Sequence, residues 1–436
     1  MSGTVAGLQS LLARACDIRP GETRATLASF SLVLLLMASY YLLRPVRDAM
    51  ASDWSDAQVS SLWTGTFLFS LLAVSLYGWI ASRVSLRRLV PGVYTLFALS
   101  FTLFWLVSRS LPRGGPVDMA FYVWVSVFSL FHVSVFWSLM SDSFSRDQSK
   151  RLFAFIGAGA SVGALLGPSL ATGLAGAASS DDLLPLASGL LLLALPLVVM
   201  VQGRSASGDG PDPSAAPLGG NPLSGYRDLL SSPYLLGICL FIFLYTALSS
   251  FIYFELKNLL EDYDRDQRTQ IWAAMDLAVN GLTLLVALFA TGRIASRLGL
   301  PFTLACVPVL ICAGMVLLAA LPQVGIVVAV QVVRRAGNYA ISRPAREMLF
   351  TAVGKHTRYK TKPVIDIVVY RGGDMLNAWA FTALTQGLGL GLAAVAGVGA
   401  GVAFLWALVG VALGRHFNRQ QPPETDRGSW RSEPSG

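Results

Sequence analysis

The sequence predicts an all-α membrane protein of about 12 transmembrane helices, built from two similar six-helix halves. Long uncharged apolar runs, an uneven placement of basic residues and a polar segment near mid-chain predict it. Of the 436 residues, 54% are hydrophobic and 13% are charged, whereas soluble domains carry about 25% charged residues. The run from Leu183 to Val201 holds no ionisable residue. About 20 such residues cross the hydrocarbon core as a helix, which satisfies its own backbone there.

The expected membrane spans form two sets. The first set covers residues 25–50, 57–81, 89–108, 119–142, 152–175 and 182–202. The second set covers residues 233–257, 269–292, 300–320, 322–346, 363–386 and 389–414. The first apolar run is too long for a cleavable signal peptide and has no small-residue cleavage site after it, so we expect it to be a span.

A segment rich in Gly, Pro, Ser and Ala, from Ser205 to Gly225, separates the two sets. This composition is typical of a flexible linker. The expected organisation is an N-terminal six-helix bundle over residues 1–202, a cytoplasmic linker over 203–232, a C-terminal six-helix bundle over 233–414 and a disordered cytoplasmic tail over 415–436.

Basic residues are distributed unevenly among the connections between spans. The chain has 33 Lys and Arg and a formal net charge of +8, yet the odd-numbered connections hold only Arg109, Arg113, Arg265 and Arg268. The positive-inside rule therefore predicts cytoplasmic termini, with a bacterial inner membrane as the expected location. The same asymmetry accounts for most of the net positive charge without a nucleic-acid partner.

A short repeat relates the two halves. The segment from Gly78 to Leu86 recurs from Gly292 to Leu300, with six of nine positions identical. Both copies follow the second span of their half. Six plus six helices with a central linker is the arrangement of the major facilitator superfamily, in which substrate binds between the halves near the midplane. The repeated Gly/Arg segment resembles that superfamily's loop between its second and third helices, without the usual aspartate and second glycine.

Small residues recur at helical spacing in the fifth span. Gly159, Gly163 and Gly167 follow one another every four residues and share one face. Such a stripe lets two membrane helices approach closely. We interpret it as a packing face; a hinge during transport is the alternative hypothesis.

Ionisable residues lie inside several expected spans, where each costs about 2.5–3.5 kcal/mol on insertion scales. Basic side chains, the expected substrate ligands, are Arg44, Arg47, Lys257, Arg334, Arg335, Lys362 and Arg371. Acidic side chains, expected in coupling or gating, are Asp48, Glu255, Asp276, Asp366 and Asp374. Because the basic groups are in excess and arginine binds carboxylate and phosphate bidentately, the set favours an anionic substrate.

A plainer interpretation is that these charges reach an interface or pair with each other. Arg44 with Asp48 and Lys362 with Asp366 have the i, i+4 spacing of helical ion pairs. That interpretation and the substrate-binding one both stay open for any single residue.

At these residues the sequence resembles the nucleotide transporter family, the ATP/ADP translocases of plastids and intracellular bacteria. The matching segments, in chain order, are Tyr41–Ala49, Phe136–Trp137, Ser149–Phe153, Tyr339 with Arg346–Met348, Lys362–Asp366 and Arg371–Gly372. The resemblance implies a major facilitator fold and an antiporter that works by alternating access. It also implies that Arg47 and Lys362 occupy the family's cationic substrate sites.

Two functional glutamates of that family have different residues here. They are matched by Gln148 and Tyr253, although Glu255 lies two positions after Tyr253. A different coupling ion, exchange partner or substrate is therefore expected. The inference is a secondary active transporter or exchanger of an anionic metabolite, such as a nucleotide or another phosphorylated or carboxylated compound. We expect it to be a monomer in the lipid bilayer.

Other classes of function have less support in the sequence. An enzyme is not expected, because the three histidines, His132, His356 and His416, are scattered and show no metal or triad spacing. No cofactor or metal is expected either. A non-transporting scaffold or sensor with a transporter fold, and a major facilitator exporter of other organic anions, remain the alternatives. A pure scaffold would have little reason to retain buried cationic side chains.

Overall fold

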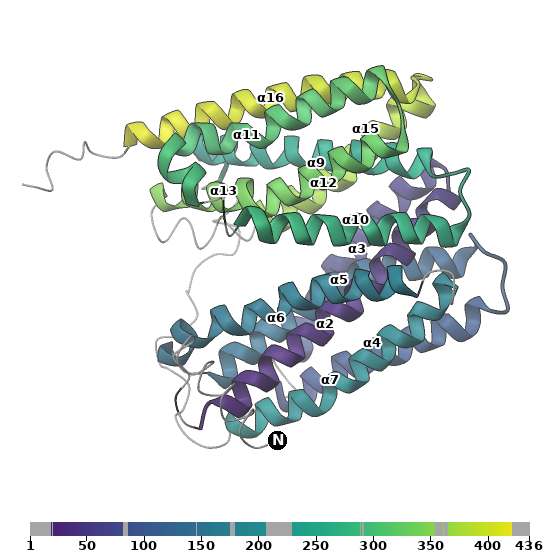
Figure 1. Ribbon diagram of the computed structural model, residues 1–436, viewed down its shortest axis with the longest axis vertical. Helices are drawn as coiled ribbons and strands as arrows, with labels where there is room; N and C mark the ends of the chain where they lie inside the picture. Colours follow the sequence, from purple (N-terminus) through teal and green to yellow (C-terminus); the bar gives the residue numbers. More distant parts are fainter. Residues whose placement is uncertain are drawn as a thin grey trace, which may run out of the picture. The chain divides into compact units, whose positions relative to one another are not determined.

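The computed structural model describes residues 19, 21–81, 86–144, 146–174, 179–205, 229–287, 289, 292–353, 361 and 365–420 (Figure 1). Every regular element in these ranges is a helix. The first half comprises α2 (Thr23–Met50), η1 (Ala51–Asp53), α3 (Asp56–Ala81), α4 (Leu86–Ser108), α5 (Pro116–Ser143), α6 (Arg146–Gly173), η2 (Ser180–Asp182) and α7 (Leu183–Ser205). Each of the six spans expected there is a helix.

The second half begins with three long helices, α9 (Pro233–Leu259), α10 (Arg265–Val286) and α11 (Gly292–Ala320), and ends with α16 (Leu392–Gln420). Two spans in between are interrupted. The tenth consists of α12 (Val324–Gly337), the π turn η5 (Asn338–Ser342) and α13 (Arg343–Leu349). The eleventh consists of the π turn η7 (Ile365–Val369), α15 (Tyr370–Thr382) and the π turn η8 (Ala383–Gly387). Such turns occur often at functional sites.

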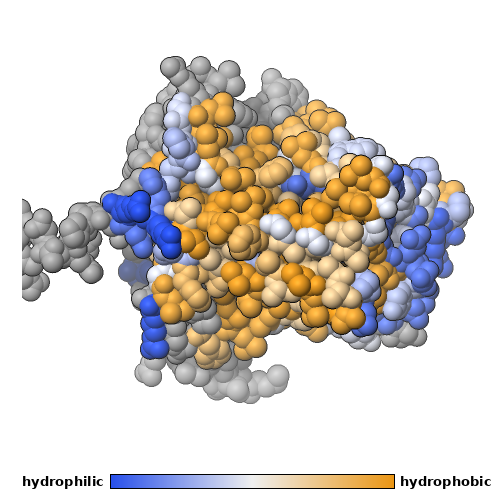
Figure 2. Space-filling view, turned by 90° about the horizontal axis from the view of Figure 1, so that it is seen from above, coloured by the Kyte–Doolittle hydropathy of each residue, from blue (hydrophilic) through white to orange (hydrophobic). Residues whose placement is uncertain are grey.

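Length and hydropathy support membrane insertion. In the described part of the chain, nine helices are long and apolar enough to cross a bilayer. Large apolar side chains on these helices are exposed, among them Leu99 and Leu193, both at 61%. Figure 2 shows hydrophobic side chains gathered over much of the face in view, with hydrophilic ones at its edges. An apolar surface of this kind is suited to lipid contact rather than to water.

The chain divides into two compact units. Unit 1 contains Met1–Leu218 and Leu256–Gly281, and unit 2 contains Gly219–Glu255 and Leu282–Gly436. The end of α9 and most of α10 thus group with the first-half helices. The expected linker lies largely in 206–228, outside the described residues, as do 421–436 of the expected tail. Residues 82–85 of the repeated segment also lie outside them.

Within unit 1, α6 packs tightly on α2 along the glycine stripe. A Cβ atom at Gly159 would lie 2.5 Å from the carbonyl oxygen of Phe30, and one at Gly167 would lie 2.7 Å from that of Ala38. No larger residue fits without a shift of backbone. The geometry therefore confirms the packing interpretation of the stripe.

Within unit 2, glycines of α16 play the same part against α11. A Cβ atom at Gly410 would lie 3.0 Å from the carbonyl oxygen of Leu304, and one at Gly414 would lie 2.5 Å from the Cα of Pro301. Both units therefore contain a helix pair that depends on small residues four apart.

Candidate functional site

In unit 1, Arg44 and Arg47 of α2 are neutralised by carboxylates. Arg47 donates hydrogen bonds to Asp48 Oδ1 from Nε at 2.9 Å and from Nη2 at 2.6 Å. Arg44 Nε lies 3.5 Å from Asp48 Oδ2 and 3.8 Å from Oδ2 of Asp276 on α10. Two arginines and two aspartates thus form one balanced cluster. The expected i, i+4 pair of Arg44 and Asp48 is present, and Asp276 joins it from another helix.

Two residues of α5 line this cluster. Arg47 Nη1 donates to Ser126 Oγ at 3.2 Å, and its guanidinium lies 5.5 Å from the ring centre of Tyr122. One turn away, the His132 ring stacks on Tyr40 with ring centres 4.8 Å apart. His132 is 2% exposed and bonds through Nδ1 to the carbonyl of Phe128. This packing agrees with a structural or cavity-lining role for His132.

In unit 2, Arg334 is not neutralised in the same way. Arg334, near the end of α12, is 3% exposed, and its Nε donates to Gln331 Oε1 at 2.9 Å. Its guanidinium lies 5.4 Å from the ring centre of Tyr245 on α9. Among the described residues no carboxylate lies within 4 Å of it, and its Nη1 has no hydrogen-bond partner. Arg334 is a buried cation with donor capacity to spare.

The first turns of α15 extend this arginine–tyrosine cluster. Tyr370 places its ring centre 6.0 Å from that of Tyr245. Asp374 interacts electrostatically with Arg371 and Arg334, but it forms no ion pair with either within the described part of unit 2. The cluster of Arg334, Arg371, Tyr245, Tyr370 and Asp374 therefore carries a net positive formal charge.

The remaining expected site residues have varied surroundings. Arg335 and Glu255 are buried in unit 2, at 2% and 0% exposure, and Tyr253 is 8% exposed. Lys257 belongs to unit 1, where its Nζ donates to Asp56 Oδ1 at 2.8 Å and to Asn258 Oδ1 at 2.7 Å. Lys362 and the side chain of Asp366 lie outside the described residues.

Gln148 has an acidic neighbour that sequence reasoning missed. Its Nε2 donates to Glu22 Oε1 at 3.0 Å, and Arg151 donates to both carboxylate oxygens at 3.0 and 3.1 Å. These bonds from Arg151, together with those from the Arg19 backbone and Gln148, lower the pKa of Glu22 to about 2 in spite of its burial. Glu22 thus supplies a carboxylate beside Gln148, the position that matches a glutamate of the nucleotide transporter family that the sequence resembles. Their separation in sequence gave no signal for this.

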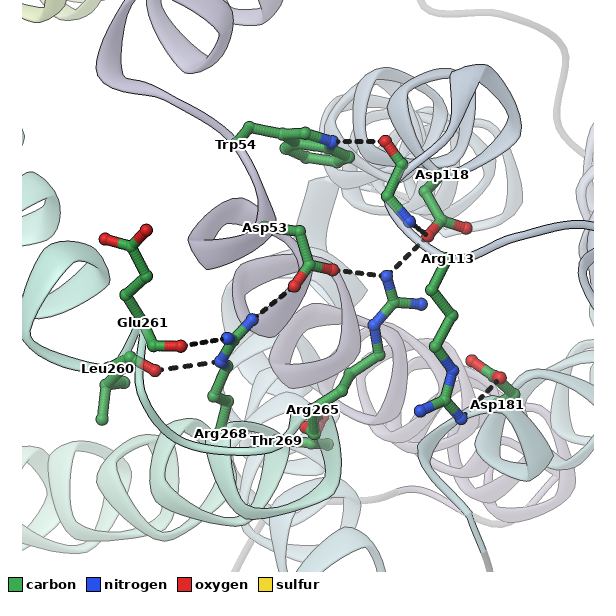
Figure 3. A network of polar contacts seen from close by, with 11 residues as sticks. Asp53, Trp54, Arg113, Asp118, Asp181, Leu260, Glu261, Arg265, Arg268 and Thr269 are labelled. Carbon is green, nitrogen blue, oxygen red and sulfur yellow. Dashed lines mark hydrogen bonds and ion pairs between the residues drawn. The ribbon is translucent and has the colours of Figure 1, made fainter.

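A further cluster missed by sequence reasoning joins side chains of η1, α5 and α10 in unit 1 (Figure 3). Arg265 bridges Asp53 and Asp118, and Arg268 contacts Asp53. The available signal was that these arginines are two of the few basic residues in the odd-numbered connections. Among the described residues no group of three or more His, Cys, Asp or Glu is placed to hold a metal.

Comparison with known families decides the class of this chain. The profile described as Major Facilitator Superfamily matches residues 29–353, well over half of the chain. The chain belongs to the Major Facilitator Superfamily. The predicted fold class is thereby confirmed, and the protein is a multi-pass membrane protein of a transporter family rather than of an enzyme family. A sequence comparison with curated proteins finds no match.

Solved transporters of this superfamily share the fold. The nucleoside transporter NupG superposes with a TM-score of 0.64 at 13% identity, covering 91% of this chain and 99% of the other. The POT family transporter PepTSo gives 0.64 at 12% identity, with the same coverage. A bacterial homologue of the lysosomal transporter Spinster, inward-facing and unoccupied, gives 0.58 at 12% identity, covering 93% of this chain and 100% of the other. The narrower resemblance to the ATP/ADP translocases stays a prediction.

Proposed function

We propose that this superfamily member is a secondary active transporter or exchanger of an anionic metabolite and works by alternating access of two helix bundles. One observation carries the proposal. Arg334 is a buried guanidinium without a carboxylate partner in the described part of the chain. Leaving an arginine buried and unpaired is costly, so such a residue persists where an anion pairs with it during function.

The contrast between the two units supports this assignment. Arg44 and Arg47 already have Asp48 and Asp276, and Lys257 has Asp56. A substrate would have to compete with these carboxylates. Among the described residues no carboxylate lies within 4 Å of the guanidinium of Arg334 or Arg371, so we assign these two arginines the main contact with the anion. Lys362 keeps the candidate role that the family resemblance gives it.

The flanking tyrosines fit a phosphorylated or carboxylated organic molecule. Tyr245 contacts Arg334 through its ring face and lies beside Tyr370, so the cluster offers both flat apolar surface and hydroxyl groups. The motifs shared with the nucleotide transporter family favour a nucleotide among such anions. The positive-inside distribution supports cytoplasmic termini in a bacterial inner membrane.

A ligand screen followed by uptake measurements tests the proposal. The thermal unfolding midpoint of the purified protein is measured with ADP, glucose 6-phosphate, malate or inorganic phosphate. Uptake of the anion that raises the midpoint is then measured in proteoliposomes. Arg334→Gln should raise the anion concentration that gives half-maximal uptake about 10- to 100-fold, since a hydrogen bond to a charged group contributes about 1.5–3 kcal/mol. Arg371→Gln should act in the same direction.

Arg343→Gln is the matched control, because Arg343 is an exposed arginine of the same half and should leave uptake unchanged. Equal half-saturation in Arg334→Gln and the control would refute the assignment of Arg334. If no anion stabilises the protein, the result would favour the alternative of a non-transporting scaffold or sensor.

A further inference from the structure

A group of exposed arginines lies at one end of the helix pair α11 and α16 in unit 2. The two helices pack side by side (Figure 1), and Gly414 of α16 lies against Pro301 of α11. Arg415 directly follows Gly414, and Arg419 lies about one turn further along α16. Arg297 precedes Pro301 by four residues. The three arginines are all exposed and come from chain segments that meet at this helix contact; they are called the basic surface below.

The positive charge of the basic surface is not compensated by its neighbours. Among the residues that the structure describes, no carboxylate lies within 4 Å of the guanidinium groups of Arg297, Arg415 or Arg419. The short helix α13 packs against both α11 and α16, but its Glu347 is already paired with Arg346 at 3.2 Å. The described part of unit 2 therefore leaves three neighbouring positive charges open to an anion from outside the protein.

Apolar side chains continue the basic surface along both helices. On α16, Phe404 and Leu408 are 59% and 51% exposed. They share one face with Arg415 and Arg419, because steps of four, seven and four residues each return close to the same side of an α-helix. On α11, Phe302 is 49% exposed. Each helix therefore presents apolar side chains next to the exposed arginines.

Figure 2 shows this change from apolar to polar surface, because it views the molecule from the side on which α11 and α16 lie in Figure 1. Hydrophobic residues cover the middle of the face in view, and hydrophilic residues gather at its edges. The left edge is the end at which α16 finishes in Figure 1. A helix face that changes from apolar to basic fits the boundary between the hydrocarbon core and the lipid headgroups.

A glycine kink sets Arg297 apart from the rest of α11. Gly299 has φ 74° and ψ 168°, a backbone conformation essentially open only to glycine, and it interrupts the helix just before Pro301. Arg297 and Leu298 lie before this kink, and Leu298 is 53% exposed. The kinked segment thus offers a basic and an apolar side chain in succession, as the two ends of α16 and α11 do together.

We propose that the basic surface binds the headgroup of an anionic phospholipid, with Phe302 and Leu408 against an acyl chain. Arginine binds phosphate oxygens bidentately, and basic surfaces between membrane helices attract anionic headgroups. A zwitterionic headgroup carries its own cation, which three uncompensated arginines repel. Lipid binding at this surface requires neither transport nor the anion contact assigned to Arg334.

Native mass spectrometry of the full-length protein tests the lipid site. Protein purified in detergent is incubated with phosphatidylglycerol, or with phosphatidylcholine of the same acyl chains, and the retained lipids are counted as the lipid concentration rises. The parent should retain its first phosphatidylglycerol at a lower concentration than its first phosphatidylcholine. Arg415→Gln with Arg419→Gln should raise the phosphatidylglycerol concentration needed about 30-fold, at about fivefold for each arginine. Arg297→Gln alone should raise it about fivefold.

Arg87→Gln with Arg88→Gln is the matched control, because it also removes two exposed arginines, at the start of α4 in unit 1. This pair should leave retention of the first phosphatidylglycerol unchanged. Arg415→Lys with Arg419→Lys keeps both charges and should retain the preference for phosphatidylglycerol, which separates the effect of charge from a change in packing.

Retention of phosphatidylglycerol by the Arg415→Gln and Arg419→Gln pair at the parent's concentration would overturn the site. An equal loss in the control pair would also overturn it, because overall positive charge would then account for the binding. Excess inorganic phosphate separates a lipid from a free anion. Bound phosphatidylglycerol should persist in phosphate, since apolar contacts also hold it, whereas complete displacement would refute the lipid in favour of a free anion.

Discussion

Asp48 determines how much positive charge the first membrane helix presents. Its carboxylate contacts both Arg44 and Arg47, and its side chain is 2% exposed. Without it, the largely buried guanidinium groups of Arg44 and Arg47, at 16% and 13% exposure, would keep only the contact between Arg44 and Asp276 as an ion pair. Removing one partner of a buried ion pair costs about 3–5 kcal/mol, because the remaining charge is left uncompensated.

Asp48→Asn should therefore lower the stability of the protein by about 3 kcal/mol, seen as a lower midpoint of thermal unfolding in detergent. Adding Arg47→Gln should recover part of the loss, since it removes the stranded charge. The control is Arg113→Gln, whose pair with Asp181 is 54% exposed on the arginine side and should contribute about 0–1 kcal/mol. Equal losses in Asp48→Asn and Arg113→Gln would contradict the buried-cluster interpretation.

At this scale the sequence could predict contacts within one helix but not between helices. The pair of Arg44 and Asp48 follows from i, i+4 spacing. The contacts of Asp276 with Arg44 and of Glu22 with Gln148 depend on which helices become neighbours. Helical spacing within one segment carries no information on that. The same holds for the spare donor of Arg334, which only the packing around it reveals.

Among the elements, α2 and α6 show most clearly how small residues set helix packing. A Cβ atom at Gly163 would lie 2.9 Å from Met37 Cβ and closer still to the carbonyl oxygen of Leu34. Gly157 lies on the same helix with nothing within 4 Å of its position. The two glycines thus make a matched pair for substitution.

Gly163→Ala should destabilise the protein by about 1–3 kcal/mol, because overpacking forces the helices apart. Gly157→Ala should be neutral or stabilising by roughly 0.5–1 kcal/mol, since alanine loses less backbone entropy in a helix. Thermal unfolding of both variants, side by side, measures the difference. A loss of the same size in both would mean that α6 does not depend on close approach to α2.

The presence of each membrane helix was predictable from the sequence, whereas the π turns that interrupt two of them were not. Apolar length identifies a span whatever the details of its hydrogen bonding. The π turns η5, η7 and η8 leave length and hydropathy almost unchanged, so neither pattern indicates them. Two of them, η5 and η7, nevertheless lie next to Arg334 and Arg371 in the sequence, the arginines assigned to the substrate. Hydropathy predicted the helices but not the breaks that shape the candidate site.

For the whole molecule, the placement and pairing of basic residues in the connections between spans bear on its orientation in the membrane. The odd-numbered connections hold few basic residues, and three of these, Arg113, Arg265 and Arg268, form ion pairs in the structure. Their charges are thus largely compensated locally. The more numerous basic residues of the even-numbered connections would then hold the orientation.

The prediction is that Ser110 faces the outside of the membrane and Arg343 the cytoplasm. With the native cysteines replaced by serine, Ser110→Cys should react in intact cells with a membrane-impermeant maleimide. Arg343→Cys should react only after the cells are opened, because both positions are exposed but lie on opposite sides of the bilayer. Labelling of Arg343→Cys in intact cells, with Ser110→Cys protected, would reverse the orientation.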